Sequence, residues 1–495
     1  MERSIAESNS GRLLHVMILA ALYSIPAAIG MRPIVDLDIW WHLRQGGWIL
    51  ANWTLPTTDP FTSYGLGKTW IAYSWLYEVV VYVLYQAYGL FGVVLYTTLL
   101  AFAVTFALHR LLRRETEDFI VASGLTAIAL GSMFPALAQP RPWLFNVLFV
   151  TLELTVLLQV RRSGTTRPLW ALPPLFLIWA CINIQFVYGL FILVLAIAEA
   201  LLIRWLPLWN IDGHFRTKPM LFTLAACTIA TCLTPYHVKI YLPVITAVRL
   251  TDPFLFLAEL QAPPFRLIFD WLALGLLLIA AFLLGRQRTI SPFLMLLLAT
   301  STSLAFRARR DVWFLVIVSV TIIAMAQLRL TVGRRPLTIP QRIAVVVIVL
   351  VVSLSLGLTR ASASRLDHAL AEAFPTKAAA FVEKQGYRGA LYNHYDWGGY
   401  LMWRLPDFDV SLDGRNPVHG DARIWQSIRT WGGAPGWGSD PDLAAANIVV
   451  ADVNTPLASL LRTDGRFELA YEDQVAAVFI NRRTIPARLP EKRGL

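Results

Sequence analysis

Apolar runs separated by short polar segments occupy the first 359 residues of the chain. We find about eleven such runs of roughly 20 residues, the length that a helix needs to cross the hydrocarbon core of a bilayer. They lie at residues 13–33, 90–109, 117–138, 143–160, 168–184, 186–206, 219–237, 267–285, 290–306, 312–328 and 342–359. The pattern predicts an α-helical polytopic membrane domain over residues 1–359, with about eleven transmembrane helices.

The first run, residues 13–33, has features of a signal peptide. Arg12 precedes it, and small residues surround Ala27 and Ala28. Because further spans follow, we interpret this run as an uncleaved membrane anchor.

Basic residues occupy every second loop between the runs. If the N-terminus is cytoplasmic, so are the following residues: Arg3, Arg12, Arg110, Arg113, Arg114, Arg161, Arg162, Arg167, Arg204, Arg216, Lys218, Arg286, Arg288, Arg329, Arg334, Arg335 and Arg342. This is the charge bias of short cytoplasmic loops. An odd number of spans then places the C-terminal region on the outer face.

The segment at residues 74–89 is apolar but short, and it contains Glu78. Counting it as a span would reverse the charge bias of every later loop. We therefore interpret it as an interfacial or re-entrant helix within one large outer loop, residues 36–89. An amphipathic segment after Asp38 begins this loop.

Composition supports a membrane protein and argues against nucleic-acid binding. Hydrophobic residues make up 56% of the 495-residue chain and charged residues 15%, against about 25% charged in soluble domains. The net charge of +11 comes mostly from the short loops, where it orients the protein. The 18 Trp and 16 Tyr suit long membrane interfaces.

The last 136 or so residues have a different pattern, with shorter apolar runs and more Gly, Pro, Asp and Arg. Strand-like pieces GALYN, DVSLD, NIVVAD, RFELAY and AAVFIN alternate with helix-like pieces TKAAAFVEKQ, GGYLMWRL, RIWQSIRTW and TPLASLLRT. Such alternation predicts a small α/β domain at residues 360–495, on the outer face. The domain contains no cysteine, which excludes a disulfide framework there.

Two acids, Asp36 and Asp38, follow the first run in the stretch IVDLDIWWHLRQGGW. They could simply end the helix in water, but His42 lies four residues after Asp38, and Glu78 lies in the same loop. Charged groups near membrane depth usually mark function or pairing, and one carboxylate against a hydroxyl suffices for a general base. The aromatic side chains of Trp41 and Trp75 could shield such a site or stack on sugar rings.

Arginines gather in a second place, AFRARRDVWF, which the predicted topology puts on the outer face. Arg307, Arg309 and Arg310 there depart from the charge bias of the other outer loops. They could pair with Asp311, or they could bind phosphate, whose oxygens match a guanidinium fork. Arg141, in another outer loop, could join them or pair with an outer-loop acid.

Outer acids together with outer arginines suit sugar transfer from a lipid-linked phosphate donor, and the sequence has no Gly-rich nucleotide loop. The chain resembles the GT-C superfamily of multi-spanning glycosyltransferases, in a bacterial branch with the motif DxDIWWHLRxGxWI. The likeness continues through LPTTDPFTSYGLGKTWIAYSWLYE, QPRPWLF, RARRDVWF, LYNHYDWGGYLMWRLP and VSLDGR.

The resemblance implies a glycosyltransferase of the bacterial cytoplasmic membrane that uses a polyprenyl-phosphate sugar. It implies an acid role for Asp36 and Asp38, contacts to acceptor or sugar for His42, Glu78, Trp41 and Trp75, and lipid-phosphate binding for Arg141, Arg307, Arg309 and Arg310. Its partners would be this donor, membrane lipids and a glycan, lipid or protein acceptor. The chain reads INIQFVYG where the branch often has Asn-x-His-Gly, so a histidine site is absent there.

Several alternatives stay open from the sequence. The chain could be an inactive GT-C-fold subunit that serves as a scaffold for a protein partner, or a lipid-linked-sugar transporter, although we find no inverted repeat. Whether a divalent cation bridges Asp36 and Asp38 is also open. In the C-terminal domain Asn393, His394, Asp396 and Asp413 could contact the acceptor, but turn formation explains them more simply. His394 and His419 lack the spacing of metal ligands.

Overall fold

The computed structural model describes residues 2–63, 65–205, 213–249, 257–287, 291–326 and 338–483, with side chains from residue 13 onward. The chain forms two compact units. The helical unit comprises residues 1–32, 93–241 and 251–362, and the mixed unit comprises residues 33–92, 242–250 and 363–495. Arg288, Arg329, Arg334 and Arg335, which entered the predicted orientation, lie outside the described residues.

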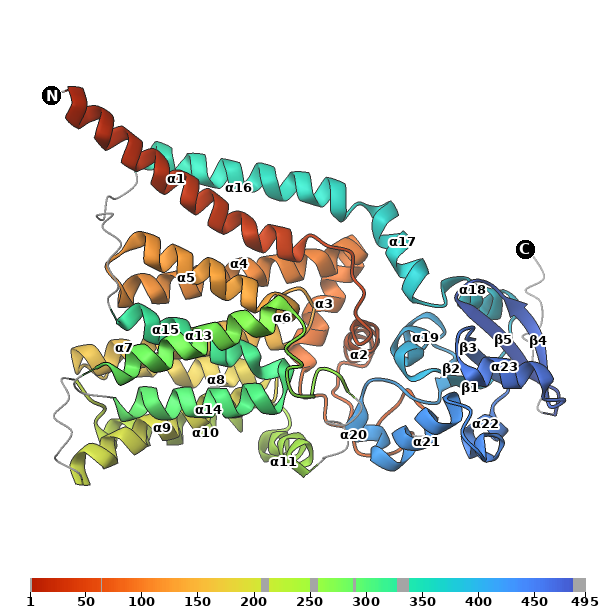
Figure 1. Ribbon diagram of the computed structural model, residues 1–495. Coiled ribbons are helices and arrows are strands. Elements are labelled where there is room, and N and C mark those ends of the chain that lie inside the picture. The colour runs from red at the N-terminus through yellow and green to blue at the C-terminus, as the bar shows by residue number, and fades with distance from the viewer. Residues whose placement is uncertain are drawn as a thin grey trace. The chain divides into compact units, whose positions relative to one another are not determined.

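The helical unit is a bundle in which every one of the eleven predicted runs contains a helix (Figure 1). These helices are α1 (Glu2–Gly30), α4 (Leu90–Glu115), α5 (Phe119–Ser132), α7 (Trp143–Ser163), α8 (Leu172–Ala180), α9 (Phe186–Trp205), α10 (Thr217–Thr231), α13 (Ile268–Gly285), α14 (Pro292–Arg307), α15 (Val312–Met325) and α16 (Ile339–Arg360). Short pieces α6 (Phe134–Leu137), η1 (Arg167–Ala171), η2 (His237–Tyr241) and η3 (Arg309–Asp311) join them.

Six helices among the described residues are long and apolar enough to cross a membrane: α1, α4, α7, α9, α13 and α16. The other predicted runs hold helices of 9 to 16 residues. The chain is therefore a helical membrane protein, while the count of eleven spans stays a prediction.

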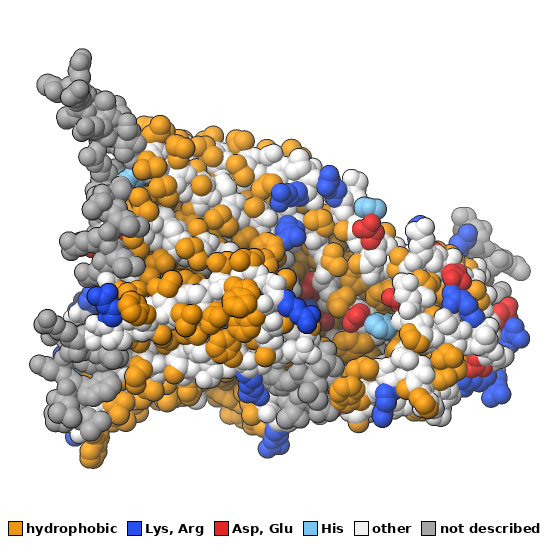
Figure 2. Space-filling model, in the orientation of Figure 1, with side chains coloured by type: hydrophobic (Ala, Val, Ile, Leu, Met, Phe, Trp, Pro, Cys, Tyr) orange, Lys and Arg blue, Asp and Glu red, His pale blue; other side chains and the backbone are white. Residues whose placement is uncertain are grey.

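Burial differs sharply between two apolar helices of this unit. In α15 every residue from Trp313 to Ala324 is buried, because α5, α7, α13 and α14 pack around it. A helix that is apolar on all sides belongs in a core or in lipid. By contrast, α16 has no buried residue and packs mainly on α1. Hydrophobic side chains cover most of the visible face of the bundle (Figure 2), as expected of a surface that meets lipid tails.

The mixed unit contains a five-stranded sheet in the order β2-β1-β3-β5-β4. Its strands are β1 (Gly389–Asn393), β2 (Phe408–Val410), β3 (Ile448–Asp452), β4 (Phe467–Glu472) and β5 (Ala476–Asn481). β1 pairs in parallel with β2 and β3, whereas β5 pairs antiparallel with β3 and β4. The predicted small C-terminal α/β domain is confirmed. Every predicted strand and helix piece overlaps an element, but of the piece DVSLD only Asp409 and Val410 lie in a strand.

The helices of this unit pack on the sheet or on one another. They are α17 (Ala363–Ala373), α18 (Thr376–Lys384), α19 (Gly398–Arg404), α20 (Asn416–His419), α21 (Asp421–Trp431), α22 (Pro441–Ala445) and α23 (Pro456–Thr463), with α11 (Leu242–Arg249) and the short turns η4 (Tyr395–Trp397) and η5 (Trp437–Ser439). Tyr392, Trp431, Leu443, Leu461 and Phe479 belong to one buried core.

The first large loop also belongs to the mixed unit. It folds into α2 (Ile39–Asn52) and α3 (Trp75–Tyr88), which pack together, and α19 packs on α2. Between them, Thr62 forms a parallel bridge to Val410 at the edge strand β2, and the Ser63 amide donates to the Val410 carbonyl at 3.0 Å. The loop thus covers an otherwise open sheet edge.

Candidate functional site

Asp36 and Asp38 occupy different environments at the start of α2. Asp36 is 4% exposed, and its Oδ1 accepts the amides of Asp38 and Ile39, each at 2.9 Å. It therefore satisfies backbone donors that a helix start leaves without partners. Asp38 is half-buried and its own side chain makes no such capping bond. Of the two, Asp38 is the carboxylate that a second molecule can reach.

Asp38 lies against the C-terminal part of the mixed unit. A Cβ added to Gly414 would stand 2.0 Å from its Oδ1, so only glycine leaves room for the carboxylate there. Tyr395 is close enough that, after burial, the charge of Asp38 helps to raise the pKa of the Tyr395 phenol. The Tyr395 hydroxyl donates to Asn416 Oδ1 at 2.5 Å. A first-loop acid and the LDGRN turn thus form one cluster.

His42 and Glu78, which the sequence placed in the same outer loop, contact each other in the interior of the protein. His42 Nδ1 lies 3.1 Å from Glu78 Oε1, and Gln45 Nε2 donates to Glu78 Oε2 at 2.6 Å. Trp70 Nε1 donates to Gln45 Oε1 at 2.8 Å. Burial raises the pKa of Glu78 to about 8, although the Gln45 hydrogen bond and the charge of Arg415 oppose the shift. This network locks α2 to α3.

Trp41 and Trp75 differ in accessibility. Trp41 is 5% exposed and its ring lies 3.5 Å, centroid to centroid, from that of His42. Trp75, at the start of α3, is half-buried. Only Trp75 of the pair has a substantial surface open to a ligand.

A buried ion cluster, which the sequence interpretation missed, joins the first loop to the C-terminal residues. Arg415 is fully enclosed: its Nη1 donates to Asp59 Oδ1 at 2.6 Å, and its Nη2 donates to Asp413 Oδ2 at 2.7 Å. Its guanidinium lies 5.2 Å from the ring centroids of Phe61 and Trp70, within the range of cation–π attraction.

Electrostatics hold this cluster in its charged form. Burial opposes ionisation of Asp413, but Arg415 and the adjacent His419 outweigh it and keep the pKa of Asp413 well below its usual range. Burial would likewise lower the pKa of Arg415, and the carboxylates of Asp413 and Asp59 raise it instead. A Pro/Gly-rich loop containing a lone Asp59 gave no local signal for this pairing, since its partner is 356 residues away.

The polar residues NHYD after β1 have mixed roles. Asn393 Nδ2 donates to the carbonyls of His394 and Leu412, each at 2.9 Å, and its Oδ1 accepts the Ser411 amide at 3.0 Å. It ties neighbouring strand ends together. His394 and Asp396 are partly exposed, with Nδ1 and Oδ2 3.8 Å apart.

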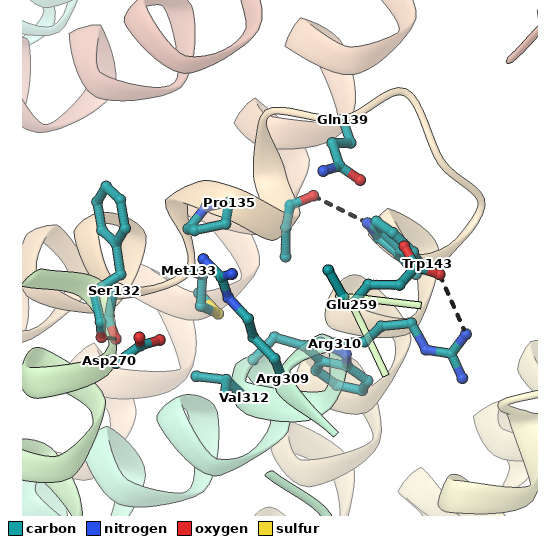
Figure 3. Close-up of a pocket in the computed structure, with 14 residues that line it drawn as sticks. Ser132, Met133, Pro135, Gln139, Trp143, Glu259, Asp270, Arg309, Arg310 and Val312 are labelled. Carbon is teal, nitrogen blue, oxygen red and sulfur yellow. Dashed lines mark hydrogen bonds and ion pairs between the residues drawn. The ribbon is translucent and has the colours of Figure 1, made fainter. Parts of the chain in front are cut away.

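A cavity of about 270 Å³ lies within the helical unit (Figure 3). It is lined by Ser132, Met133, Pro135, Ala136, Gln139, Trp143, Ala258, Glu259, Phe269, Asp270, Arg309, Arg310, Val312 and Trp313. Two of the predicted phosphate-binding arginines, Arg309 and Arg310, therefore face one cavity. Arg310 Nη1 is 3.9 Å from Glu259 Oε1, which is a long ion pair.

The other two predicted arginines do not line this cavity. Arg307 is exposed at the end of α14. The Arg141 guanidinium lies 5.2 Å from the ring centroid of Trp143, whose other atoms face the cavity.

Asp311 is held by the segment INIQFVYG and not mainly by its neighbouring arginines. Gln185 Nε2 donates to its Oδ1 at 2.8 Å, and the Tyr188 hydroxyl donates to its Oδ2 at 2.9 Å. Burial raises the pKa of Asp311, with the charge of Arg310 as the largest opposing effect. This anchors η3 and so fixes the backbone that carries Arg309 and Arg310.

Metal-ligand geometry is not found in the described part of the chain, where no three or more His, Cys, Asp or Glu side chains are grouped to hold an ion. Asp36 and Asp38 are neighbours, but the two amides on Asp36 Oδ1 already occupy part of that donor set.

Comparisons with known proteins concern the fold. No protein-family model and no curated protein sequence matches the chain. Among solved structures, ArnT from Cupriavidus metallidurans bound to undecaprenyl phosphate is similar over 94% of this chain and 97% of that one, with TM-score 0.52 and 12% identity. The apo oligosaccharyltransferase of Archaeoglobus fulgidus is similar over 89% of this chain and 69% of that one, with TM-score 0.51 and 11% identity.

A third similar structure is the archaeal oligosaccharyltransferase AglB from Archaeoglobus fulgidus in complex with an inhibitory peptide and a dolichol-phosphate. It has TM-score 0.51 and 13% identity, and the match covers 89% of this chain and 69% of that one. These similarities extend over most of the chain, although the identities are low. The chain therefore shares its overall fold with ArnT and with the archaeal oligosaccharyltransferase, and it has a small α/β domain after its helices.

Proposed function

We propose that this protein transfers a sugar from a polyprenyl-phosphate-linked donor to an acceptor at the outer face of a bacterial cytoplasmic membrane. The fold carries this proposal: it is shared over most of the chain with ArnT, solved with undecaprenyl phosphate, and AglB, solved with dolichol-phosphate. The N-terminus would be cytoplasmic, the transmembrane domain would comprise residues 1–359, and the domain at residues 360–495 would be extracytoplasmic.

Arg309 and Arg310 are the proposed ligands of the lipid phosphate. They line one cavity, and a guanidinium fork matches phosphate oxygens bidentately. Arg141 and Arg307 would contribute only long-range charge. Since the leaving group is a phosphate that gains negative charge, nearby fixed cations stabilise the transition state more than the ground state.

Asp38 is the proposed general base. Its carboxylate takes the proton of an acceptor hydroxyl, whose oxygen attacks the anomeric carbon of the donor. The bond from that carbon to the phosphate oxygen breaks, and the polyprenyl phosphate leaves with the electron pair, so the anomeric configuration is inverted. Asp36, whose oxygen holds two amides, would position Asp38 at the start of α2.

His42, Glu78 and Trp41 would support Asp38 structurally and would not contact the substrate. All three are at most 5% exposed, so their role is to hold α2 on α3. Trp75 would provide the aromatic surface for a sugar ring.

The test is a transfer assay with detergent-purified full-length protein and a panel of decaprenyl-phosphate hexoses and pentoses. Asp38→Asn keeps the shape and removes the base, and we expect the rate to fall roughly 10²–10⁴-fold without a change in melting temperature. The exposed Asp409→Asn, in the same unit, is the matched control. Full activity in Asp38→Asn, in Asp36→Asn and in the double variant would remove these acids from the mechanism.

A second candidate is an inactive subunit that serves a membrane protein complex. The observation in its favour is that Asp36, His42 and Glu78 are engaged in internal hydrogen bonds. A well-folded wild-type protein that transfers nothing from any donor in the panel, and that co-purifies with a defined partner, would favour this candidate.

A further inference from the structure

The cavity of the helical unit carries two hydrogen-bond acceptors that the proposed phosphate site does not use. Asp270, in the first turn of α13, is 4% exposed, and its Oδ2 is buried without a hydrogen-bond partner among the described residues. The Oε1 of Gln139, which precedes α7, is likewise buried and has no hydrogen-bond partner among the described residues. Both side chains line the cavity (Figure 3).

A buried polar atom without a hydrogen-bond partner destabilises the folded protein, and a charged one does so more strongly. A bound ligand that donates hydrogen bonds would remove this cost. Asp270 also gains from the positive end of the α13 helix dipole, but that attraction supplies no hydrogen to Oδ2. A ligand that brings hydroxyl groups would supply one to each acceptor.

Three other polar side chains of the cavity are hydrogen-bond donors. Arg309 and Arg310 are donors with positive charge, and Trp313 Nε1 is a buried donor without a partner among the described residues. Glu259 offsets part of the charge of Arg310. The arginines and the Trp313 indole can therefore donate hydrogen bonds to an anion. Asp270 and Gln139 can accept hydrogen bonds from hydroxyl groups.

The apolar lining sets the size and shape of a fitting ligand. Trp143, Phe269 and Trp313 provide aromatic surface. The volume of about 270 Å³ is at the lower limit for sites of drug-sized ligands, which suits a small headgroup and not a long prenyl chain. A sugar attached to a phosphate has all three properties: an anion, several hydroxyl donors and apolar ring faces.

We propose that Asp270 and Gln139 recognise the hydroxyl groups of the donor sugar while its phosphate lies at Arg309 and Arg310. This inference rests on the proposed function and adds the residues that distinguish a sugar-loaded lipid phosphate from a bare one. Asp270 is then a specificity residue: it stabilises the loaded donor and does nothing for the spent polyprenyl phosphate, which can leave.

The experiment measures dissociation constants of full-length protein in detergent for three probes: inorganic phosphate, decaprenyl phosphate, and decaprenyl phosphate bearing one of a panel of hexoses and pentoses. We expect wild type to bind at least one loaded lipid about ten-fold or more tightly than the bare lipid, since one hydrogen bond to a charged group contributes about 1.5–3 kcal/mol. Asp270→Asn and Gln139→Leu should reduce this preference while bare-lipid affinity stays the same. Asp367→Asn, an exposed residue of α17, is the control.

Each outcome decides the inference. Equal preference in wild type and in both variants, or no preference in wild type for any sugar, overturns it. Equal weakening of bare and loaded lipids in Asp270→Asn also overturns it, because the acid would then act only on the arginines or on folding. If wild type transfers sugar in the separate assay while Asp270→Asn keeps its preference, the inference fails and the proposed function stands.

Discussion

Arginines of the two units lie in contrasting surroundings. Arg415 in the mixed unit is fully enclosed and donates to Asp59 and Asp413 at 2.6 and 2.7 Å. Arg309 and Arg310 in the helical unit are half-buried in a cavity, and the ion pair between Arg310 Nη1 and Glu259 Oε1 is 3.9 Å long. Arg415 is paired with carboxylates of the protein itself, whereas Arg309 and Arg310 line a cavity that a ligand can enter.

This contrast separates a structural charge from a candidate ligand-binding charge. A buried ion pair seldom adds net stability over apolar packing, but removing one partner leaves an uncompensated charge. A cation in an open cavity is hydrated when no ligand is bound, so its removal costs the fold little. Substitution of Arg415 should therefore lower stability, whereas substitution of Arg309 or Arg310 should lower ligand affinity and leave stability nearly unchanged.

The largest effect is expected from Arg415→Met. Two buried carboxylates would lose their partner, at a cost of about 3–5 kcal/mol. For a unit of this size each kcal/mol corresponds to about 2–4 °C, so we expect the melting temperature to fall by roughly 6–20 °C. Intrinsic fluorescence of the purified protein during heating measures it.

The matched control is Arg388→Met, because Arg388 pairs with Asp407 at 3.3 Å on the surface, where both side chains are exposed. Exposed pairs contribute at most about 1 kcal/mol. If the melting temperature of Arg415→Met equals that of Arg388→Met, the buried cluster does not stabilise the contact between the loop and the C-terminal residues.

The next effect concerns binding and not folding. Arg309→Gln and Arg310→Gln should each weaken decaprenyl phosphate binding about 10–100-fold, since hydrogen bonds to charged groups contribute about 1.5–3 kcal/mol. The melting temperature should stay close to that of wild type. Arg365→Gln, on the exposed face of α17, should change neither quantity. If Arg309→Gln and Arg310→Gln lower the melting temperature and do not specifically weaken lipid binding, these arginines have a structural role like that of Arg415.

A third effect is a pH dependence of stability from Glu78, whose pKa is influenced by the charge of Arg415. Its folded-state pKa is raised from 4.5 to about 8, so the folded protein holds a proton that the unfolded chain releases. The stability that the neutral form contributes is fully present below about pH 4.5 and is lost as pH rises through about 8.

Wild-type protein should therefore melt at progressively lower temperature as pH rises across this range, and the fall should be larger than in Glu78→Gln. The glutamine resembles the neutral acid and can still donate to His42 and accept from Gln45. Glu372→Gln, in a largely exposed pair with His368, should retain the wild-type pH profile. Parallel profiles for wild type and Glu78→Gln would mean that Glu78 does not take up a proton on folding.

Local pattern predicted much of the fold, as the C-terminal strands illustrate. The pieces GALYN and AAVFIN became β1 and β5, because alternating apolar side chains favour a pleated element whatever lies elsewhere. The sequence also placed His42 and Glu78 in one loop, but their contact at 3.1 Å comes from the structure. Their burial was not predictable, because it depends on what packs over α2 and α3.

The arginine stretch shows the limit of such reasoning. RARR identified a charged loop, but spacing could not tell that Arg309 and Arg310 line a cavity while Arg307 does not. The turn at η3, anchored through Asp311 by Gln185 and Tyr188, decides which way each side chain points. Asp270 and Gln139 were unremarkable in sequence for the same reason.

The sequence by itself determined that this is a membrane protein of apolar helices with a small α/β domain, since hydrophobic length and periodicity act within a few turns of chain. Only the tertiary structure decided which charges meet. Asp59 and Arg415 are 356 residues apart, and Asp270 and Arg309 reach one cavity from different helices. Burial then sets their role: a charge enclosed with its partner stabilises the fold, and a charge beside an open cavity remains available to a ligand.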